Sequence, residues 1–468
     1  MMQSDLSRRR LLKNTTLLGV SAVLPTAYAS GTQLLPIPPL LDVGRGRPIL
    51  LSMGSSKKAF IDAKKVEVWG FNGLYLGPTI RCKQGDFVRL NYSNQLSQRV
   101  SISLQGLQVN AELLGGVGRQ FDSSTGWSPI VPITQSAATC WYHADTLAHS
   151  AYQVYRGLSG MWWIDDEESR KAKLPNKYGV NDIPLILQDV RLNSQGEQLF
   201  NPNQRQFLGN RLLVNGAEAP YLNVARGWVR LRLLNASLSR GYNLNLDDGR
   251  SIWVLAGGLG FLPQPREVRS LFLAPGERAE ILIDLNEGGN VALISGEKRG
   301  FFDKMTSWFA DENELIDNTV LALRPDGLLS AFEQKIDFQR QEQISTDVVV
   351  TQQRSFMLDV ENALINQQKF DPRRVDVNAA LGSYERWHLS ATAPIGFSLQ
   401  GAKFLLESFN GQAIDASQLT WRDTVWVNGN ISILVKFDQT SSNNYPFTFG
   451  SSDLMLADKG CMGMLVVQ

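Results

Sequence analysis

A short run of alternating apolar and polar residues, preceded by a turn, is the clearest pattern along this chain. In its first copy the turn Phe-Asn-Gly at 71–73 comes before the run 85–94, in which Val88, Leu90 and Tyr92 share one face. Alternation with a period of two is typical of a β-strand that covers one side of a core. The run therefore predicts a strand of this kind.

The same pattern returns twice, at intervals of about 150 residues, which is the length of an ordinary domain. The second copy has the turn 214–216 and the run 227–236, and the third, weaker copy has the turn 365–367 and the run 382–389. Arginines lie among the residues on the face opposite the apolar one. Turns such as Asn-Gly are common in any β protein, but coincidence does not account for three copies in the same order.

A polar turn before an apolar run also recurs, at 273–278 before 279–285 and at 421–424 before 425–427. Many short strands, 40 glycines, 19 prolines and no long amphipathic helix favour an all-β chain of antiparallel Greek-key sandwiches. Charged, proline-bearing stretches at 165–175 and from 324 onward are expected boundaries. We therefore expect three domains, which span residues 30–170, 180–325 and 340–468.

Length and charge agree with such a chain. A sequence of 468 residues is too long for one hydrophobic core, and 43% hydrophobic residues is typical of folded soluble domains. The formal net charge is +1, and no basic run follows the N-terminal segment. Because nucleic-acid binding depends on many lysine and arginine contacts to phosphate, this charge pattern excludes it.

The N-terminal segment, residues 1–29, predicts export. Its signal residues are Ser7, Arg8, Arg9, Leu11, Leu12 and Lys13, then a mildly apolar stretch at 15–24, and finally Ala27 and Ala29. This order resembles a twin-arginine signal peptide, whereas a plain basic tail would not explain it. We expect cleavage after Ala29, and no membrane span, because no later apolar run approaches the roughly 20 residues that a span needs. We also expect a monomer.

Three cysteines follow the expected cleavage site, namely Cys82, Cys140 and Cys461. A small, odd number argues against a disulfide framework, so the fold must rest on its hydrophobic cores. Cys82 shares the parity of Ile80 in a strand-like run and is expected to lie in a core. We assign none of the three cysteines a chemical role.

Three such units in series, together with four short motifs, resemble the multicopper oxidase family of cupredoxin-like domains across nearly the whole chain after residue 29. In that family four histidine-rich motifs, two in the first domain and two in the third, hold copper. A blue-copper centre needs two imidazoles and a thiolate, and the oxygen-reducing cluster needs further imidazoles. The resemblance implies about ten histidines and one cysteine as ligands, whereas this chain has three histidines.

Other residues occupy the two motif positions of the first domain. The family sequence His-x-His-Gly is Ser-Leu-Gln-Gly at 103–106. The family sequence Trp-Tyr-His-x-His keeps only His143, and Asp145 stands at its last position. One imidazole therefore remains of the four that these two motifs supply in the family.

The two motifs of the third domain have lost every histidine. The family sequence His-Pro-x-His-x-His-Gly lies at 395–401 without a histidine. The last motif, His-Cys-His with a later histidine and an axial methionine, best fits 450–452 with Leu456 and Cys461. Because serine, glutamine and leucine supply neither thiolate nor imidazole, we expect no copper, no other cofactor and no catalytic residue.

Other centres are weaker alternatives. His143 and His149 lie six residues apart with Asp145 between them and could hold a divalent ion, although a lone histidine on a strand is more often a hydrogen-bonded structural residue. His388 is expected to meet solvent. The Asp-Asp pairs at 165–166 and 247–248 are expected to be solvated rather than poised as acid and base.

A copper-less member of this family behind a twin-arginine signal resembles a bacterial branch that works in cell division, on the runs 72–81, 227–237 and 421–427. The resemblance implies a non-catalytic periplasmic protein at the division septum, which binds divisome proteins and stabilises the divisome, especially under stress. The alternatives are a copper-dependent oxidase and a wall-glycan binding module. A candidate binding surface is the aromatic stretch 301–309, although a short amphipathic helix that caps a sandwich is the commoner explanation of such spacing.

Overall fold

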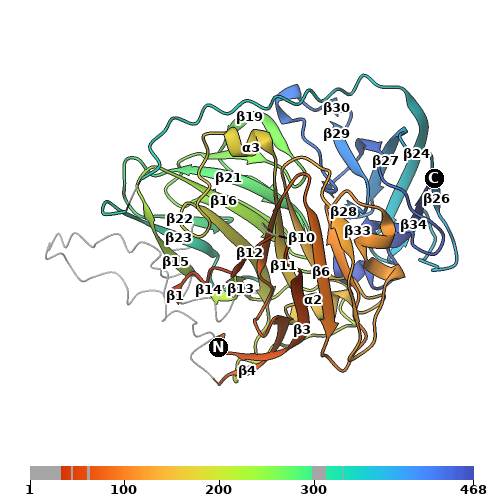
Figure 1. Cartoon of the computed structure of the whole chain (residues 1–468), viewed down its shortest axis with the longest axis horizontal. Helices are drawn as coiled ribbons and strands as arrows, with labels where there is room; N and C mark the ends of the chain where they lie inside the picture. The colour runs from red at the N-terminus through yellow and green to blue at the C-terminus, as the bar shows by residue number, and fades with distance from the viewer. Residues whose placement is uncertain (1–32, 44–45, 61–63, 298–312, 330) are drawn as a thin grey trace, which may run out of the picture.

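The computed structural model describes residues 33–43, 46–60, 64–297, 313–329 and 331–468, which form mostly β-strands (Figure 1). The described strands assemble into six sheets, so the predicted all-β fold is confirmed. The export-signal residues from Ser7 to Ala29 and the aromatic stretch 301–309 lie outside the described residues. No helix among the described residues is long and apolar enough to cross a membrane.

Two sheets built from the first 165 residues face each other across a core. One has the order β2-β5-β11-β10-β7, and the other has the order β4-β3-β6-β8 with β9 beside β6. Leu51, Leu90 and Trp162 are buried between them. The elements are β2 (Leu40–Asp42), β3 (Ile49–Lys58), β4 (Val66–Phe71), β5 (Thr79–Lys83), β6 (Phe87–Asn94), β7 (Ile102–Gln105), β8 (Gly126–Trp127), β9 (Ile130–Pro132), β10 (Ala138–Ala144), β11 (Ser159–Asp165), α1 (Ala111–Leu114), η1 (Gly116–Gly118), α2 (Ser150–Arg156) and α3 (Glu167–Lys171).

The middle of the chain forms a second pair of sheets with its own core. The strand orders are β1-β15-β23-β22-β17-β20 and β14-β13-β12-β16-β21-β18-β19. Leu185, Leu231 and Ile281 are fully buried in this core. The strands are β1 (Gln33–Leu34), β12 (Asp182–Val190), β13 (Arg211–Val214), β14 (Ala217–Glu218), β15 (Pro220–Ala225), β16 (Trp228–Asn235), β17 (Tyr242–Leu246), β18 (Ile252–Ala256), β19 (Phe261–Val268), β20 (Leu271–Leu273), β21 (Arg278–Asp284), β22 (Val291–Ser295) and β23 (Thr319–Asp326).

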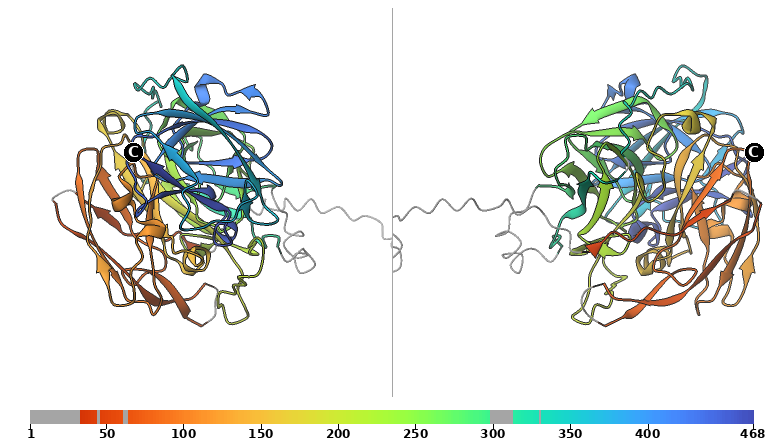
Figure 2. Two further views of the ribbon diagram at one scale, coloured as in Figure 1. Left: turned by 90° about the vertical axis from the view of Figure 1, so that its right-hand side faces the viewer. Right: turned by 60° about the vertical axis from the view of Figure 1, so that its left-hand side comes forward.

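The C-terminal part forms the third pair of sheets. Their orders are β25-β24-β27-β32-β29-β30 and β26-β34-β33-β28-β31, and Trp387, Phe397 and Phe437 are fully buried between them. The elements are β24 (Val350–Asp359), β25 (Leu364–Ile365), β26 (Val377–Ala379), β27 (Tyr384–Ala391), β28 (Ile395–Leu399), β29 (Lys403–Phe409), β30 (Gln412–Ala413), η3 (Ala416–Gln418), β31 (Thr424–Val427), β32 (Ile431–Lys436), β33 (Phe447–Ser451), α5 (Leu454–Ala457) and β34 (Met462–Val467). Figure 2 shows the three units packed against one another.

The three repeat strands occupy the same place in the three units. Each repeat strand lies beside the first long strand of its unit, in the pairs β3–β6, β12–β16 and β24–β27, and all three pairs are parallel. The antiparallel pairing that the sequence predicts for these sandwiches therefore does not extend to these three pairs. After the first hairpin of each unit the chain crosses to the opposite sheet, through β5, β15 or β26, and therefore returns in the starting direction.

The turn that marks each copy has a common geometry. Asn72, Asn215 and Asn366 all have positive φ, at 57°, 51° and 49°. The residue that follows also has positive φ, 75° at Gly73 and 65° at Gln367. Asparagine and glycine favour such a turn, whereas glutamine does not, which explains why the third copy is weaker in sequence.

Each turn asparagine also holds the first strand of its unit. Asn72 accepts a hydrogen bond from the Ser52 N–H (2.9 Å) and donates one to the Leu50 carbonyl (2.9 Å). Asn215 binds Ile186 and Pro184 in the same way, and Asn366 binds Met357 and Ser355. In all three copies the side-chain amide therefore brackets the strand: it binds the N–H of one residue and the carbonyl of the residue two positions earlier.

Two local expectations are revised, and one is refined. Asp165 and Asp166 are buried rather than solvated, because Asp165 forms a salt bridge with Arg81 (2.7 Å) and Asp166 caps α3. Asp247 is half-buried and accepts the Ala292 N–H, while Asp248 is exposed. His388 is half-buried on the face opposite the buried Trp387 and Leu389, and its Nδ1 lies 2.8 Å from the Ser432 hydroxyl, so it is hydrogen-bonded as well as partly exposed to solvent.

The cysteines are core residues. Cys82, Cys140 and Cys461 are all buried and unpaired. The prediction for Cys82 is confirmed. Burial raises the pKa of the Cys82 and Cys461 thiols to about 12, so both stay protonated near neutral pH.

Candidate metal centre

The four motif positions meet where the first and third pairs of sheets touch. Ser103 and Gln105 lie on β7, His143 lies on β10, and Gln400 directly follows β28. Gln105, His143 and Gln400 line a small cavity of about 40 Å³ together with Asp145, Ser398, Gly450 and Ser452. The fold therefore gathers the residues that stand at the ligand positions of the oxygen-reducing cluster.

His143, the one histidine left at a ligand position, is held on every side. One ring nitrogen (Nδ1) lies 2.8 Å from the carbonyl oxygen of Ala144, and the other (Nε2) lies 3.0 Å from the side-chain amide of Gln105. The ring stacks on Trp141 with 3.9 Å between centroids. Burial lowers the pKa of His143, against an opposing effect of Asp145, so the imidazole is neutral at neutral pH. Both ring nitrogens thus lie within hydrogen-bond distance of a protein group.

A glutamine joins the two sides of this cavity. The Gln400 amide donates to the Asp145 carboxylate (2.8 Å) and to the Ser103 hydroxyl (3.2 Å). All three residues are buried. Because the amide nitrogen of Gln400 is satisfied by both partners, these residues occupy the place where the family puts imidazoles. We call them, with Gln105 and His143, the neutral cluster, because the side chain that joins the carboxylate to the hydroxyl is a neutral amide.

The blue-copper position is filled differently, by apolar packing. Ile395 and Leu456 are buried with 1% and 0% exposure. The Ser451 hydroxyl is engaged by the backbone of Asp453, which in turn caps α5. Cys461 points its thiol at the carbonyl of Leu364 (3.6 Å). The segment thus keeps the family's backbone path with side chains that offer copper no imidazole.

These residues do not fit copper. Type-1 copper needs two imidazoles and a thiolate, and here the matching positions hold isoleucine, serine and leucine, with a protonated thiol as the fourth. Across the described part of the chain, no group of three or more His, Cys, Asp or Glu side chains is placed to hold a metal ion. The alternative centre of His143, Asp145 and His149 is not formed, and His149 is exposed at the start of α2.

A charged network that the sequence did not reveal lies nearby, between the first and second units. The arginine face of β16 is buried, and the exposure of Arg230 and Arg232 is 3% and 2%. Arg230 donates to Glu280 (2.9 Å) and Arg232 forms two 2.9 Å hydrogen bonds with Asp182. Glu280 accepts a hydrogen bond from Thr139 of β10 (2.6 Å), so the network crosses between units.

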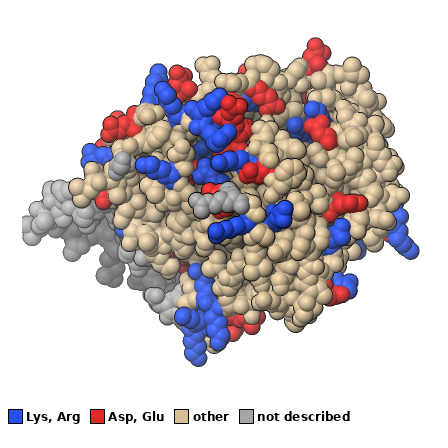
Figure 3. Space-filling view, viewed as in Figure 1, with Lys and Arg blue, Asp and Glu red and all other residues tan. Residues whose placement is uncertain are grey.

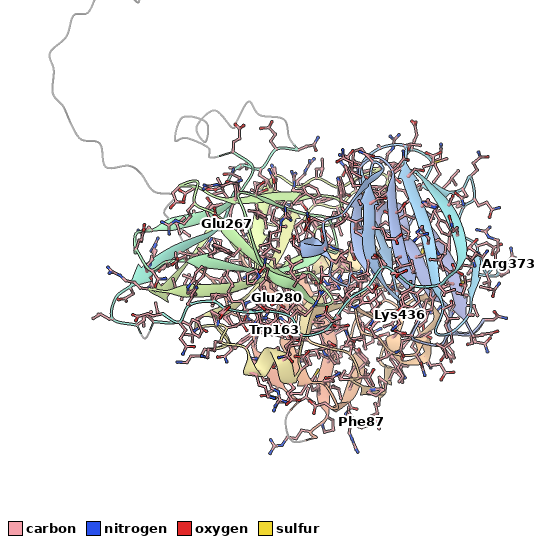
Figure 4. The ribbon with its side chains drawn as sticks, turned by 90° about the horizontal axis from the view of Figure 1, so that it is seen from above. Phe87, Trp163, Glu267, Glu280, Arg373 and Lys436 are labelled. Atoms are coloured by element: carbon pink, nitrogen blue, oxygen red, sulfur yellow. The ribbon has the colours of Figure 1, made fainter. Side chains whose placement is uncertain are left out.

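The same network extends to the third unit. Arg278, which is fully buried, forms a bidentate salt bridge with Asp423 (2.8 and 2.9 Å) and also donates to the Thr139 carbonyl (3.1 Å). Trp163 of β11 lies under the guanidinium of Arg232 at 4.0 Å. Figure 4 shows Glu280 and Trp163 close together at the centre of the molecule. We call the set of Asp182, Arg230, Arg232, Arg278, Glu280 and Asp423 the charged network.

A multicopper oxidase family model matches residues 53–169. A solved bacterial laccase-like multicopper oxidase from Ochrobactrum sp. superimposes with a TM-score of 0.85 at 30% identity, over 93% of this chain and 100% of that chain. A multicopper oxidase from Campylobacter jejuni has a TM-score of 0.79 at 22% identity, over 93% and 95%, and shares the fold. The chain thus has the cupredoxin-like architecture of the multicopper oxidases, as predicted.

Curated relatives of nearly full length refine this class. The chain is 56% identical over 463 residues to "Cell division protein FtsP" of Actinobacillus succinogenes, which covers 99% of both chains. Identity to the proteins of the same name is 54% for Haemophilus influenzae and 46% for Edwardsiella tarda, again over 99% of both chains. The chain belongs to the FtsP family of cell division proteins.

Proposed function

We propose that this chain is a non-catalytic periplasmic protein of the bacterial division machinery, which stabilises the assembled divisome at the septum through protein–protein contacts, especially under stress. Relatives named for cell division support the role in division. The observation that carries the non-catalytic part is the neutral cluster, in which Gln400, Asp145 and Ser103 bond to one another at the former copper positions. The basic and small residues of the N-terminal segment support export by the twin-arginine route.

A scaffold without side chains for copper supports a role in contacts with other proteins. The scaffold of six sheets is intact, whereas the side chains that would bind copper are replaced by groups that bond to one another. On the face drawn in Figure 3, basic and acidic side chains are interspersed, so this face carries no single-signed field of the kind that phosphate-rich polymers need.

The role in division is tested in cells that lack the gene. The full chain should restore normal cell length under envelope stress, and a fluorescent fusion should gather at the septum. Arg8→Lys with Arg9→Lys should retain the fusion in the cytoplasm and abolish rescue. A chain that rescues growth without ever reaching the septum would contradict the proposed place of action.

The absence of catalysis is tested with copper. Mature protein folded with excess Cu(II) and then desalted should retain far less than one copper per chain and should show no oxidase activity on phenols or metal ions. Ser103→His with Gln105→His serves as a control that adds imidazoles at the cavity. Stoichiometric copper with blue absorbance in the unaltered chain would overturn the non-catalytic proposal.

A further inference from the structure

The first strand of the third unit differs from its counterparts. In the first two units the turn asparagine brackets the strand close to its start. Asn72 binds Leu50 while β3 begins at Ile49, and Asn215 binds Pro184 while β12 begins at Asp182. Asn366 binds Ser355, yet β24 already begins at Val350. The third copy therefore carries an extension of its first strand that the other two lack.

One side of this extension has no backbone partner. β24 pairs with β27 from Val350 to Leu358, whereas on its other side β25 pairs only with Leu358 and Asp359. Backbone groups alternate along a strand. Because the Met357 N–H and the Ser355 carbonyl face Asn366, the N–H and carbonyl of Gln353 face the same outer side. Among the described residues, none forms a backbone hydrogen bond with the outer side of residues 351–354.

The extension is also open to solvent. Thr351, Gln352 and Gln353 are all exposed, and Val349 just before the strand is 84% exposed. Figure 1 shows β24 at the right-hand margin of the molecule, next to β26 and the C-terminus. The corresponding part of the face in Figure 3 is largely uncharged. A polypeptide can therefore approach this edge without displacing any described element.

The edge strand β19 is protected against pairing with another chain, and β24 is not. β19, an edge strand, contains Pro263 and Pro265, and Arg340 donates a hydrogen bond to the Phe261 carbonyl. Prolines and lysines are the usual means of keeping an edge from pairing. β24 contains neither, and its one basic residue, Arg354, is held by Glu385 (2.7 Å). Its register shift at Val350/Gln352 bends only the start of the strand.

We propose that the outer edge of β24, from Thr351 to the N–H of Ser355, binds an extended segment of a partner protein, which adds a strand to the sheet. Unpaired N–H and carbonyl groups in strand spacing are recognised by another main chain. The exposed side chains of this edge are neutral and polar, and its one charged side chain, Arg354, is paired with Glu385. The edge therefore presents its backbone for pairing without a large apolar surface, and Val349 offers one apolar contact. This inference rests on the proposed function and names its contact surface.

A peptide segment fits this edge better than a second copy of the chain does. The free edge is bounded by the Asn366 bracket on one side and by the register shift on the other. An extended peptide can use a site of this length, whereas a stable dimer of folded chains normally buries at least about 1,200 Å². The chemistry recognised is thus an extended main chain with small or neutral side chains.

The test uses purified residues 30–468 and 12-residue peptides that tile the periplasmic segments of the cell's division proteins. At least one peptide should bind, and binding should slow amide exchange at Gln353 and Ser355 at least tenfold while exchange in β19 is unchanged. Gln353→Pro removes an outward N–H that makes no contact with β27, so it should weaken binding at least tenfold. Gln353→Ala, the matched control, should change binding less than threefold.

Each result of these experiments either supports or overturns the proposed edge site. If Gln353→Pro does not fold, Thr351→Lys with Gln353→Lys keeps every backbone donor and should still weaken binding tenfold. Equal binding by these variants, or no bound peptide while the chain still reaches the septum, overturns the edge site and leaves the proposed function standing. Self-association that Gln353→Pro abolishes would assign the edge to a second copy instead. Failure of the chain to reach the septum and to rescue growth is the separate failure of the proposed function.

Discussion

The neutral cluster and the charged network are both buried, and both join separate units, but the side chains that make the link differ in charge. Gln400 links the third unit to the first by two neutral-donor hydrogen bonds, whereas Arg278 links the second unit to the third by a bidentate salt bridge. In the neutral cluster a neutral amide donor satisfies a carboxylate and a hydroxyl, whereas in the charged network each buried arginine needs a carboxylate partner. The link between units at the former copper positions therefore needs no charged donor.

The former blue-copper position and the charged network respond to pH with opposite sign. Beside the former blue-copper position, burial raises the pKa of Asp453 to about 7. In the charged network, burial opposes ionisation of Glu280, but Arg230 and Arg232 outweigh it and lower the pKa of Glu280 to about 2. Asp453 therefore favours the folded state at low pH, and Glu280 favours it at high pH.

The largest expected effect comes from breaking the salt bridge of the charged network. Asp423→Ala leaves the fully buried Arg278 without its carboxylate and should lower the free energy of unfolding by about 3–5 kcal/mol. Urea unfolding measures the change. Asp371→Ala, which removes the partner of the exposed Arg373, is the control and should cost less than about 0.5 kcal/mol. Equal losses of unfolding free energy in the two variants would show that the buried salt bridge stabilises the fold no more than the exposed one does.

Glu280→Gln should cost about 2–4 kcal/mol at neutral pH, because Arg230 and Arg232 lose a charged partner. The pKa of Glu280 falls from its ordinary value of 4.5 to about 2 on folding, so its contribution is full above 4.5 and is lost as pH falls toward 2. The variant should thus lose part of the acid dependence of stability. An unchanged slope between these pH values contradicts the assignment.

Gln400→Ala should have a smaller effect, about 1–2 kcal/mol, because it leaves Asp145 and Ser103 short of one neutral donor. Thermal unfolding at neutral pH measures it. Gln400→His is a useful second variant, because it places an imidazole at a former ligand position beside His143. A loss for Gln400→Ala as large as that for Asp423→Ala would erase the distinction between the two regions.

Asp453→Asn should change the pH dependence of stability more than the stability at low pH. Asparagine keeps the cap on α5, and it removes a carboxylate that resists ionisation. Because burial raises the pKa of Asp453 to about 7, its stabilising share is present below its ordinary value and is lost as pH rises through 7. Because one pKa unit corresponds to about 1.4 kcal/mol, the variant should gain roughly 2–3 kcal/mol over the unaltered chain between pH 5 and pH 8. Stability curves that stay parallel to those of the unaltered chain would count against the raised pKa.

The repeat was readable from sequence because its signals are local. Asn72 and Asn215 need positive φ, and the alternation that follows fixes which face of β6 and β16 is apolar. The missing copper ligands were equally local, since a ligand position is defined by its neighbours in a motif. The parallel pairing was missed because strand direction depends on a crossover through the opposite sheet.

The charged network could not be predicted because alternation shows that a face is polar, not what covers it. Arg230 and Arg232 look like surface residues until β10 of the first unit is placed against them. One signal was present, since Arg278 and Asp423 both lie in the recurring polar turn before an apolar run. Their partnership over 145 residues becomes visible only in three dimensions.

The burial of all three cysteines determines which conditions the protein needs in order to fold. With Cys82, Cys140 and Cys461 all protonated inside the cores, no covalent cross-link contributes to the structure. Its completion therefore requires no oxidant, and dithiothreitol should neither melt it nor slow its refolding. The same native state is accessible on either side of a membrane, whatever the redox balance there.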